Sequence, residues 1–235
     1  MKKLAKIISL MLAIVLVLAV TGCSGQKKIT IGIIQYMDHV ALDNAREGFI
    51  EALKENGYVD GENIKIDYQN AQGDQSNLST ISDRFIKNKV NLVLAIATPA
   101  TQSIAGKTTE IPILGTAITD YVSAKLVNSN EAPGTNVSGT SDMNPIKEQI
   151  DLLVKLVPNA KTVGVLYTSS EDNSILQAKI AREAIEALGL KYVEVTVSST
   201  NDVQQATQSI VGQCDAIYIP TDNTFASAMP IVNGV

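Results

Sequence analysis

The segment ITIGII, residues 29–34, is an aliphatic run interrupted by one glycine, and the chain returns to this pattern in KTVGVL at residues 161–166. Each run precedes a helical pattern that ends in glycine, EALKENG at 51–57 and EAIEALG at 183–189, and both pairs of segments keep the same offset. Any two strand–helix units share some features of this kind, but two blocks at one offset favour an internal repeat. The repeat predicts two similar lobes in tandem.

Strand-like and helix-like segments alternate strictly in the first half of the chain. The helix after residue 34 has apolar residues at helical spacing and ends at Gly57, a residue type that favours the left-handed conformation beyond a helix. A second helix, at 77–87, is opened by Asp74 or Ser76, and a third begins with Thr98 as candidate N-cap. Buried-type strands are expected at 63–69, 91–97 and 111–116. This alternation predicts an α/β fold with two doubly wound, parallel-sheet lobes.

The boundaries of the lobes follow from changes in composition. A bridge at residues 128–145 is rich in Gly, Pro, Ser and Asn, and the strand–helix programme restarts after it. We expect a chain of five parts: a signal peptide at 1–22, a lipidated linker at 23–28, an N-terminal lobe at 29–120, a hinge or crossover at 121–140 and a partial C-terminal lobe at 141–235.

The first residues have the layout of a secretory signal. Lys2, Lys3 and Lys6 precede an uncharged apolar run, and VTGC at residues 20–23 follows it. These four residues resemble the bacterial lipobox, in which a peptidase cuts before the cysteine and the thiol carries a diacylglycerol. Cys23 is then a lipid attachment point, and two or three acyl chains hold the protein on the membrane. A retained membrane anchor and an ordinary signal peptide with an incidental Cys23 are the two alternatives.

Charge and motifs exclude several classes of function. The formal net charge is −5, and cleavage of the signal removes three lysines and takes it to −8, so nucleic acid is a poor partner. No G-x-S-x-G elbow, phosphate loop or dinucleotide fingerprint is present, which argues against an enzyme or a cofactor. His39 is the only histidine, and Cys214 has no cysteine partner once Cys23 is lipidated. We expect a monomer with no metal site and no disulfide.

Polar residues gather in the loops that follow the predicted strands. These loops read QYMDH, TPATQS, TAITD, YTSSEDNS and PTDNT. In doubly wound sheets, ligands bind beyond the carboxyl ends of the strands, and the free N–H groups of the helices that begin there suit an anion such as a carboxylate. Each of these residues can also be an ordinary helix cap or turn former. The loops together predict a small-molecule site in a cleft between the lobes.

Several of these segments resemble the ABC-transporter substrate-binding lipoproteins of the tryptophan-binding type. The similarity lies in IGIIQYMDHVALDNAREGFIEALKENGY, IDYQNAQGDQSNLSTISDRFI, IATPATQS, GTSD, VGVLYTSSEDNS and IPTDN. The resemblance implies a type I periplasmic-binding-protein fold on the outer face of the bacterial membrane, which closes on a solute and delivers it to a permease driven by an ATPase. By position, it implies ligand contacts at Gln35, Thr98, Thr101, Thr116, Asp120, Thr140, Asp142, Ser169, Ser170, Asn173, Ser174, Asp222 and Asn223.

For an amino-acid ligand, roles can be assigned to several of these positions. Ser169, Ser170 and nearby backbone amides would hold the carboxylate, and Asp222, or alternatively Asp120 or Asp142, would pair with the ammonium. An aromatic ligand also needs a flat apolar surface, and the chain contains no tryptophan. Stacking would therefore depend on a tyrosine, with three candidates: Tyr36, Tyr121 and Tyr167.

The resemblance also leads to an expectation about the length of the chain and to an alternative function. Members of this family usually continue beyond the point at which this sequence stops, so we expect a C-terminally truncated product with an incomplete second lobe. The same two-lobed fold also serves in sensors that signal closure to a membrane receptor, and this alternative function stays open. The neighbouring genes distinguish the two: a permease and an ATPase indicate transport, and a kinase or receptor indicates sensing.

Overall fold

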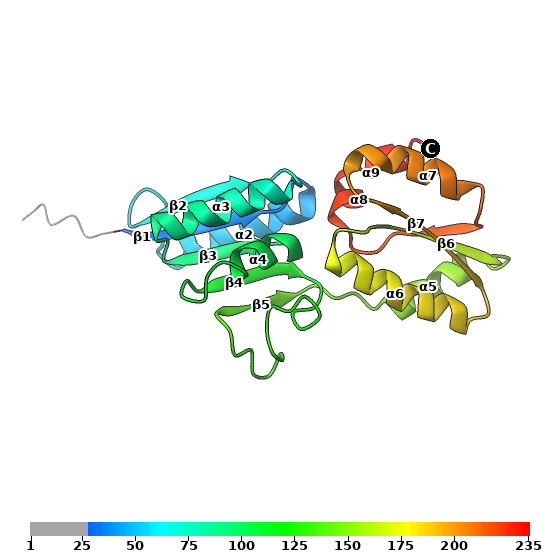
Figure 1. The fold of residues 1–235 in the computed structure, drawn as a ribbon, viewed down its shortest axis with the longest axis horizontal. Helices are drawn as coiled ribbons and strands as arrows, with labels where there is room; N and C mark the ends of the chain where they lie inside the picture. The colour runs from blue at the N-terminus through cyan, green and yellow to red at the C-terminus, as the bar shows by residue number, and fades with distance from the viewer. Residues whose placement is uncertain (1–27) are drawn as a thin grey trace, which may run out of the picture.

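The first half of the chain forms one parallel sheet of five strands in the order β2-β1-β3-β4-β5, in a computed structural model that describes residues 28–235. The strands are β1 (Ile29–Gln35), β2 (Ile64–Asn70), β3 (Leu92–Ile96), β4 (Ile113–Ile118) and β5 (Val137–Ser141). The helices of this lobe are α2 (Val40–Glu55), α3 (Gln75–Asn88) and α4 (Thr98–Ala105). The three helices lie along the sheet (Figure 1). Aliphatic side chains of β1, β3 and β4 contribute to the buried core of the lobe.

The second half forms a separate lobe around a three-stranded parallel sheet in the order β7-β6-β8. The strands are β6 (Thr162–Thr168), β7 (Lys191–Val197) and β8 (Ala216–Tyr218). The helices are α5 (Ile146–Leu156), α6 (Asp172–Ala187), the 3-10 turn η1 (Thr200–Asp202), α7 (Val203–Val211), α8 (Asn223–Ser227) and α9 (Met229–Val232). One cluster of buried residues joins α5 and α6 to the sheet and another joins α7 and α8 to it, so helices cover both faces (Figure 1).

The predicted fold class is confirmed: both lobes are parallel α/β sheets with covering helices. Of the two candidates for the start of α3, Asp74 is the N-cap, and its carboxylate accepts hydrogen bonds from the backbone N–H groups of Ser76 and Asn77. The prediction for α4 was wrong by one residue, because Ala97 is the N-cap and Thr98 is already helical. Ala97 has a positive φ of 83° and forms a sharp corner between β3 and α4.

The two glycines that the repeat pairs occupy equivalent places in the two lobes. Gly32 lies in β1, and a Cβ atom there would be 2.7 Å from a ring carbon of Phe85 on α3. Gly164 lies in β6, and a Cβ atom there would be 2.7 Å from the sulfur of Cys214 and 2.9 Å from Ile210 on α7. The repeated glycine therefore leaves room for the side chains that pack on an inner strand of each sheet.

Strand β5 was not predicted, and it changes where the chain passes between the lobes. Residues 121–140 were expected to form the hinge or crossover, but their last part joins the first sheet, where β5 pairs with β4. A register shift interrupts this pair between Gly115 and Ile118, and the Tyr121 hydroxyl donates to the carbonyl oxygens of Gly115 (2.8 Å) and Thr140 (3.2 Å) there. The chain then reaches α5 through residues 142–145.

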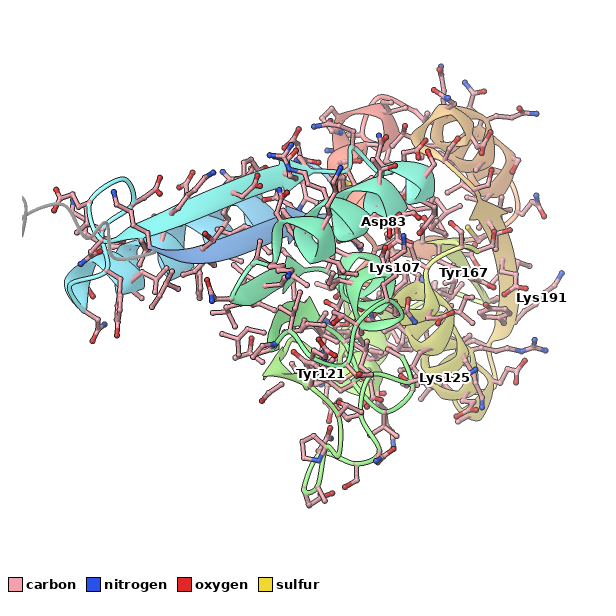
Figure 2. The ribbon with its side chains drawn as sticks, turned by 60° about the vertical axis from the view of Figure 1, so that its left-hand side comes forward. Asp83, Lys107, Tyr121, Lys125, Tyr167 and Lys191 are labelled. Carbon is pink, nitrogen blue, oxygen red and sulfur yellow. The ribbon has the colours of Figure 1, made fainter. Side chains whose placement is uncertain are left out.

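Two ion pairs of the first lobe join separate segments of the chain, Arg84 with Asp67 and Lys107 with Asp83. Figure 2 labels Asp83 on α3 and Lys107 after α4, whose side chains lie 2.7 Å apart and connect these two neighbouring segments.

Among the residues that the structure describes, no helix is both long enough and apolar enough to cross a membrane.

The close contact at Gly32 predicts a specific loss of stability. Gly32→Ala places a methyl group against the fully buried ring of Phe85, and we expect the free energy of unfolding to fall by about 1–3 kcal/mol. The measurement is urea unfolding followed by circular dichroism. Gly48→Ala is the control, because a Cβ atom at Gly48 in α2 meets nothing within 4 Å. This control should be neutral or stabilising by up to about 1 kcal/mol, and an equal loss in both variants would contradict the packing argument.

Candidate functional site

The two lobes touch through polar side chains from the carboxyl ends of their strands. Four hydrogen bonds mark this junction: Gln102 Nε2 to Asp172 Oδ2 (2.8 Å), Gln177 Nε2 to Thr119 Oγ1 (3.1 Å), His39 Nε2 to Asn223 Oδ1 (3.3 Å) and Asn144 Nδ2 to Thr221 Oγ1 (2.7 Å). The first three connect one lobe to the other, and the fourth starts from the segment that crosses between them. The loops that the sequence pointed to therefore face each other.

Asp222, predicted to pair with a ligand ammonium, is held within its own lobe. Its carboxylate accepts hydrogen bonds from the backbone N–H of Thr168 (2.7 Å), the hydroxyl of Thr168 (2.9 Å) and the backbone N–H of Phe225 (2.8 Å). It is the N-cap of α8 and only 2% exposed. These three donors explain why an acidic residue is tolerated at this buried position. Of the two roles that the sequence left open for Asp222, the structure shows the helix cap.

Glu171 is a central residue of the junction that sequence reasoning missed. Its side chain is completely buried and accepts hydrogen bonds from the Asn223 amide (2.5 Å), the Thr224 hydroxyl (3.0 Å) and the Asn173 amide (3.3 Å). Burial, together with the negative charge of nearby Asp222, raises the pKa of Glu171 to about 7. The available signal was its place directly before the helix in the segment TSSEDNS, at the end of a strand.

Two buried acceptor oxygens at the junction lack a hydrogen-bond partner among the described residues: Oδ1 of Asp142 and Oδ1 of Asn173. Asp142 follows β5 and its backbone N–H donates to Ile118, so it belongs to the first lobe, whereas Asn173 lies at the start of α6 in the second. Burial raises the pKa of the Asp142 carboxyl. An unpaired buried acceptor is costly, so a ligand that donates hydrogen bonds would find both atoms available.

Polar groups connect the residues Asp142 and Asn173 across the junction. The Thr119 hydroxyl, which favours the ionised form of the Asp142 carboxyl, accepts from the Gln177 amide. That same amide nitrogen lies 3.3 Å from the backbone oxygen of Asn173 and 3.1 Å from that of Thr221. Asp142 and Asn173 are therefore parts of one network that spans both lobes.

Gln35, a predicted ligand contact, is turned into the first lobe. Its amide nitrogen donates to Met37 and to Asp43 (2.9 Å each), and its oxygen accepts from Arg46 (2.8 Å). The hydrogen bond from Gln35 is the main reason why the pKa of Asp43 is lowered. Gln35 thus fixes the start of α2 with all of its polar atoms in use.

The predicted threonines and Asp120 line the end of the first sheet. Thr98 and Thr101 are buried, and the Thr101 hydroxyl donates to the Ala97 carbonyl oxygen (3.1 Å). The hydroxyls of Thr116 and Thr140 lie 3.2 Å apart at the ends of β4 and β5. Asp120 accepts from the backbone N–H of Ser123 (2.6 Å) and stabilises a turn.

The predicted serines of the second lobe differ in exposure. Ser174 is buried and accepts a hydrogen bond from the Asn173 amide (3.2 Å). Ser169 and Ser170 are exposed, and the Ser169 hydroxyl donates to the Val197 carbonyl oxygen (3.2 Å). Two residues of the predicted set, Asn173 and Asn223, donate to Glu171. Ser174 bonds to Asn173, and the charge of Asp222 acts on Glu171 from nearby.

The three candidate tyrosines have different environments. Tyr36 follows β1, is almost completely buried, and has its pKa raised by burial and by the charges of Glu171 and Asp222 in the other lobe. The Tyr121 hydroxyl donates to a backbone oxygen of β4, and burial raises the pKa of Tyr121 to about 12. Tyr167 donates to Glu194 on β7 (3.3 Å), and Figure 2 shows it and Tyr121 in different lobes. Tyr36 is the one of the three that faces acids across the junction.

One hollow of the described chain borders this junction, since Gln102, which donates to Asp172 across the junction, is among its lining residues. It has a volume of about 670 Å³ and lies on the first lobe, between the end of α4 and the loops around Lys125 and Thr135. At the junction itself the facing side chains already contact each other. Among the described residues no group of three or more His, Cys, Asp or Glu side chains is arranged to hold a metal ion. The polar network at the junction is therefore the candidate site, rather than the hollow.

Solved structures resemble this chain in both sequence and shape. A Streptococcus pneumoniae ABC domain in complex with L-Trp is 41% identical, with a TM-score of 0.84 over 88% of this chain and 70% of its own. A conserved domain protein from Vibrio cholerae is 38% identical, with a TM-score of 0.86 over the same shares of the two chains. The ligand-free, open structure of a substrate binding protein with adhesive properties from Clostridium difficile is 47% identical, with a TM-score of 0.60 over 87% of this chain and 70% of its own.

Sequence comparison agrees with these structures. A curated tyrosine-binding protein from Clostridioides difficile is 43% identical over the whole of this chain and 73% of its own length. The model of the family described as ABC transporter substrate binding protein matches residues 30–235. These proteins bind substrates and are not enzymes, in agreement with the absence of a catalytic motif in the sequence. The chain belongs to the ABC transporter substrate binding protein family.

Proposed function

We propose that this protein captures an aromatic amino acid between its two lobes and delivers it to the permease of an ABC importer. The observation that carries the proposal is a pair of buried acceptors, Asp142 Oδ1 in the first lobe and Asn173 Oδ1 in the second, that have no hydrogen-bond partner within residues 28–235. An α-ammonium group has three N–H donors and a positive charge, so it can satisfy both atoms and offset the cost of burying the Asp142 carboxylate. The aromatic class is inferred from the relatives that bind L-Trp or tyrosine.

The arrangement of the lobes supports a closed state. The chain matches the L-Trp complex with a TM-score of 0.84 but the ligand-free, open structure with only 0.60, although the latter is the more similar in sequence. Three side-chain hydrogen bonds between the lobes hold this arrangement. A ligand that contacts both lobes only when they are closed shifts the population toward closure, and the permease would read that shape.

The remaining predicted contacts are proposed as secondary parts of the same site. Ser169 and Ser170 would receive the ligand carboxylate, and Thr116 with Thr140 would contribute hydroxyl groups from the first lobe. Tyr36 is the preferred candidate for an aromatic contact, because it follows β1 and faces the second lobe. Asp142 replaces Asp222 as the preferred ammonium partner, since Asp222 already accepts three hydrogen bonds.

A direct binding measurement tests the proposed function. Isothermal titration of the protein from Ser24 onward should show saturable binding of L-tryptophan or L-tyrosine, and thermal unfolding should shift upward with each ligand that binds. At 100 times the dissociation constant, a ligand adds about 2.7 kcal/mol to the free energy of unfolding. L-leucine and D-glucose serve as comparison ligands. Binding of glucose, with none of the amino acids bound, would contradict the proposal.

Asp142→Asn tests the ammonium partner. Loss of the negative charge should weaken amino-acid binding about 10- to 100-fold, since a hydrogen bond to a charged group is worth about 1.5–3 kcal/mol. Without ligand, the variant should unfold at the same or a higher temperature, because the buried carboxylate no longer has to be desolvated.

Asp83→Asn is the control for this substitution. It removes a carboxylate that is paired with Lys107 on the surface of the first lobe, and it should leave the ligand affinity unchanged. An Asp142→Asn protein with wild-type affinity would exclude Asp142 as the ammonium partner.

We also propose that Cys23 anchors the protein on the outer face of the cell membrane; this residue lies outside the part of the chain that the structure describes. The proposal follows from VTGC after the apolar run. In a bacterial host, Cys23→Ser should abolish palmitate labelling and move the protein from the membrane fraction to the soluble or secreted fraction. Cys214→Ser, which changes the other cysteine, should keep the label and the membrane location. Labelling that persists in Cys23→Ser would refute the anchor.

A further inference from the structure

We propose that Glu171 is a positioning residue for the ammonium site: its carboxylate turns the amide nitrogens of Asn173 and Asn223 toward itself and so presents both amide oxygens outward. This inference rests on the proposed function and extends it, because it explains how the second lobe becomes selective for a ligand that donates hydrogen bonds. No ligand contact by Glu171 itself is required.

The contacts of Glu171 show why the two amides have a fixed orientation. The Asn223 amide nitrogen lies 2.5 Å and the Asn173 amide nitrogen 3.3 Å from the same carboxylate oxygen, Oε2. An ionised carboxylate accepts hydrogen bonds and donates none, so each asparagine must turn its NH₂ group toward it. The Asn173 NH₂ group also donates to the carbonyl oxygen of Thr221 (3.2 Å), which favours the same orientation. The oxygen of each amide then points to the opposite side.

Each outward oxygen has a consequence at the junction. Asn223 Oδ1 lies 3.3 Å from His39 Nε2, and because an amide oxygen only accepts, His39 must donate from this nitrogen. Asn173 Oδ1 is buried and has no partner among the described residues. One amide oxygen therefore connects the lobes, and the other is left for a donor from outside the protein.

Glu171 does not cap its own helix. It occupies the N-cap position of α6, but its side chain makes no capping hydrogen bond there. Its other oxygen, Oε1, accepts from the hydroxyl of Thr224 (3.0 Å) and the backbone N–H of Thr224 (3.3 Å) at the start of α8. The carboxylate is thus fully used on the residues that form one wall of the junction.

The charged and titratable groups around Glu171 come from three segments. Asp222 faces it from the loop before α8, Tyr36 faces it from the end of β1, and His39 is connected to it through Asn223. Asp222 disfavours the ionised form of Glu171, whereas the amide and hydroxyl donors favour it. The orientation of the amides should therefore follow the ionisation of this one carboxyl group.

Glu171→Gln is the test, because glutamine has the same shape but presents one acceptor and one NH₂ group. Both asparagines donate to the same oxygen, Oε2, and a glutamine whose NH₂ group stands at that place accepts from neither of them, so at least one asparagine should reverse and present its own NH₂ group to the ligand. At pH 8 we expect the affinity for L-tryptophan to fall at least 10-fold. The affinity for 3-indolepropionate, which lacks the amine, should change by less than 3-fold.

Glu186→Gln is the matched control, since Glu186 lies exposed on the same helix and pairs only with Arg182 in the described chain. This variant should keep the wild-type ratio of the two affinities. A Glu171→Gln protein that loses both ligands equally, or neither, would overturn the positioning role. Glu171→Asp, which keeps the charge, should retain more of the discrimination than Glu171→Gln does.

A measurement without ligand separates this inference from the proposed function. The side-chain amide NMR signals of Asn173 and Asn223 in the wild-type protein should shift together as pH rises through about 7, the pKa of Glu171. In Glu171→Gln this common transition should be absent. Wild-type signals that do not move in this range would refute the inference even if L-tryptophan binds. Joint movement with no amino-acid binding would instead support the positioning and refute the proposed function.

Discussion

The close approach of a covering segment to one inner strand of each sheet is the packing constraint on which this fold depends. Gly32 in β1 leaves space for the Phe85 ring, and Gly164 in β6 leaves space for Cys214 and Ile210. A larger residue at either place would push the covering layer away from the sheet, because protein interiors are packed without spare volume. The internal repeat in the sequence therefore places one glycine in each lobe where a covering side chain packs directly on the strand backbone.

The parallel arrangement of the strands determines where the candidate site forms. All strand pairs described in both lobes are parallel, so the loops that follow the strands gather at the carboxyl ends of the strands in each sheet. These ends of the two sheets face each other, and polar residues of the segments that follow the strands form the junction. Buried acids gather there, and the cost of burying them is met by donors in the case of Asp222 and Glu171. Asp142 alone keeps a buried oxygen without a donor among these three acids.

The sequence predicted the order of strands and helices because aliphatic runs and helical spacing are local patterns. Asp74 was identifiable for the same reason, as an N-cap needs only its own helix. Strand β5 was missed because VSGTS is short, polar and mostly exposed. The Tyr121 hydroxyl, which donates to a carbonyl oxygen of β4 and one of β5, lies outside both strands in sequence. A loop carboxylate does not reveal its partners in sequence, and so Asp222 was given the task of an ammonium partner while Glu171 was overlooked. Two of the residues that donate to Glu171, Asn223 and Thr224, lie about fifty positions further along the chain.

The single passage between the lobes in the described chain begins at Asp142, immediately beyond β5. The residue proposed to recognise the ligand is therefore also the first residue of the connection about which the lobes would move. Recognition and movement share one short piece of backbone, so natural variation at residues 142–145 would alter how tightly a solute is held and how readily the lobes separate at the same time. A lineage that changed its solute through this segment would also have to readjust the speed of release.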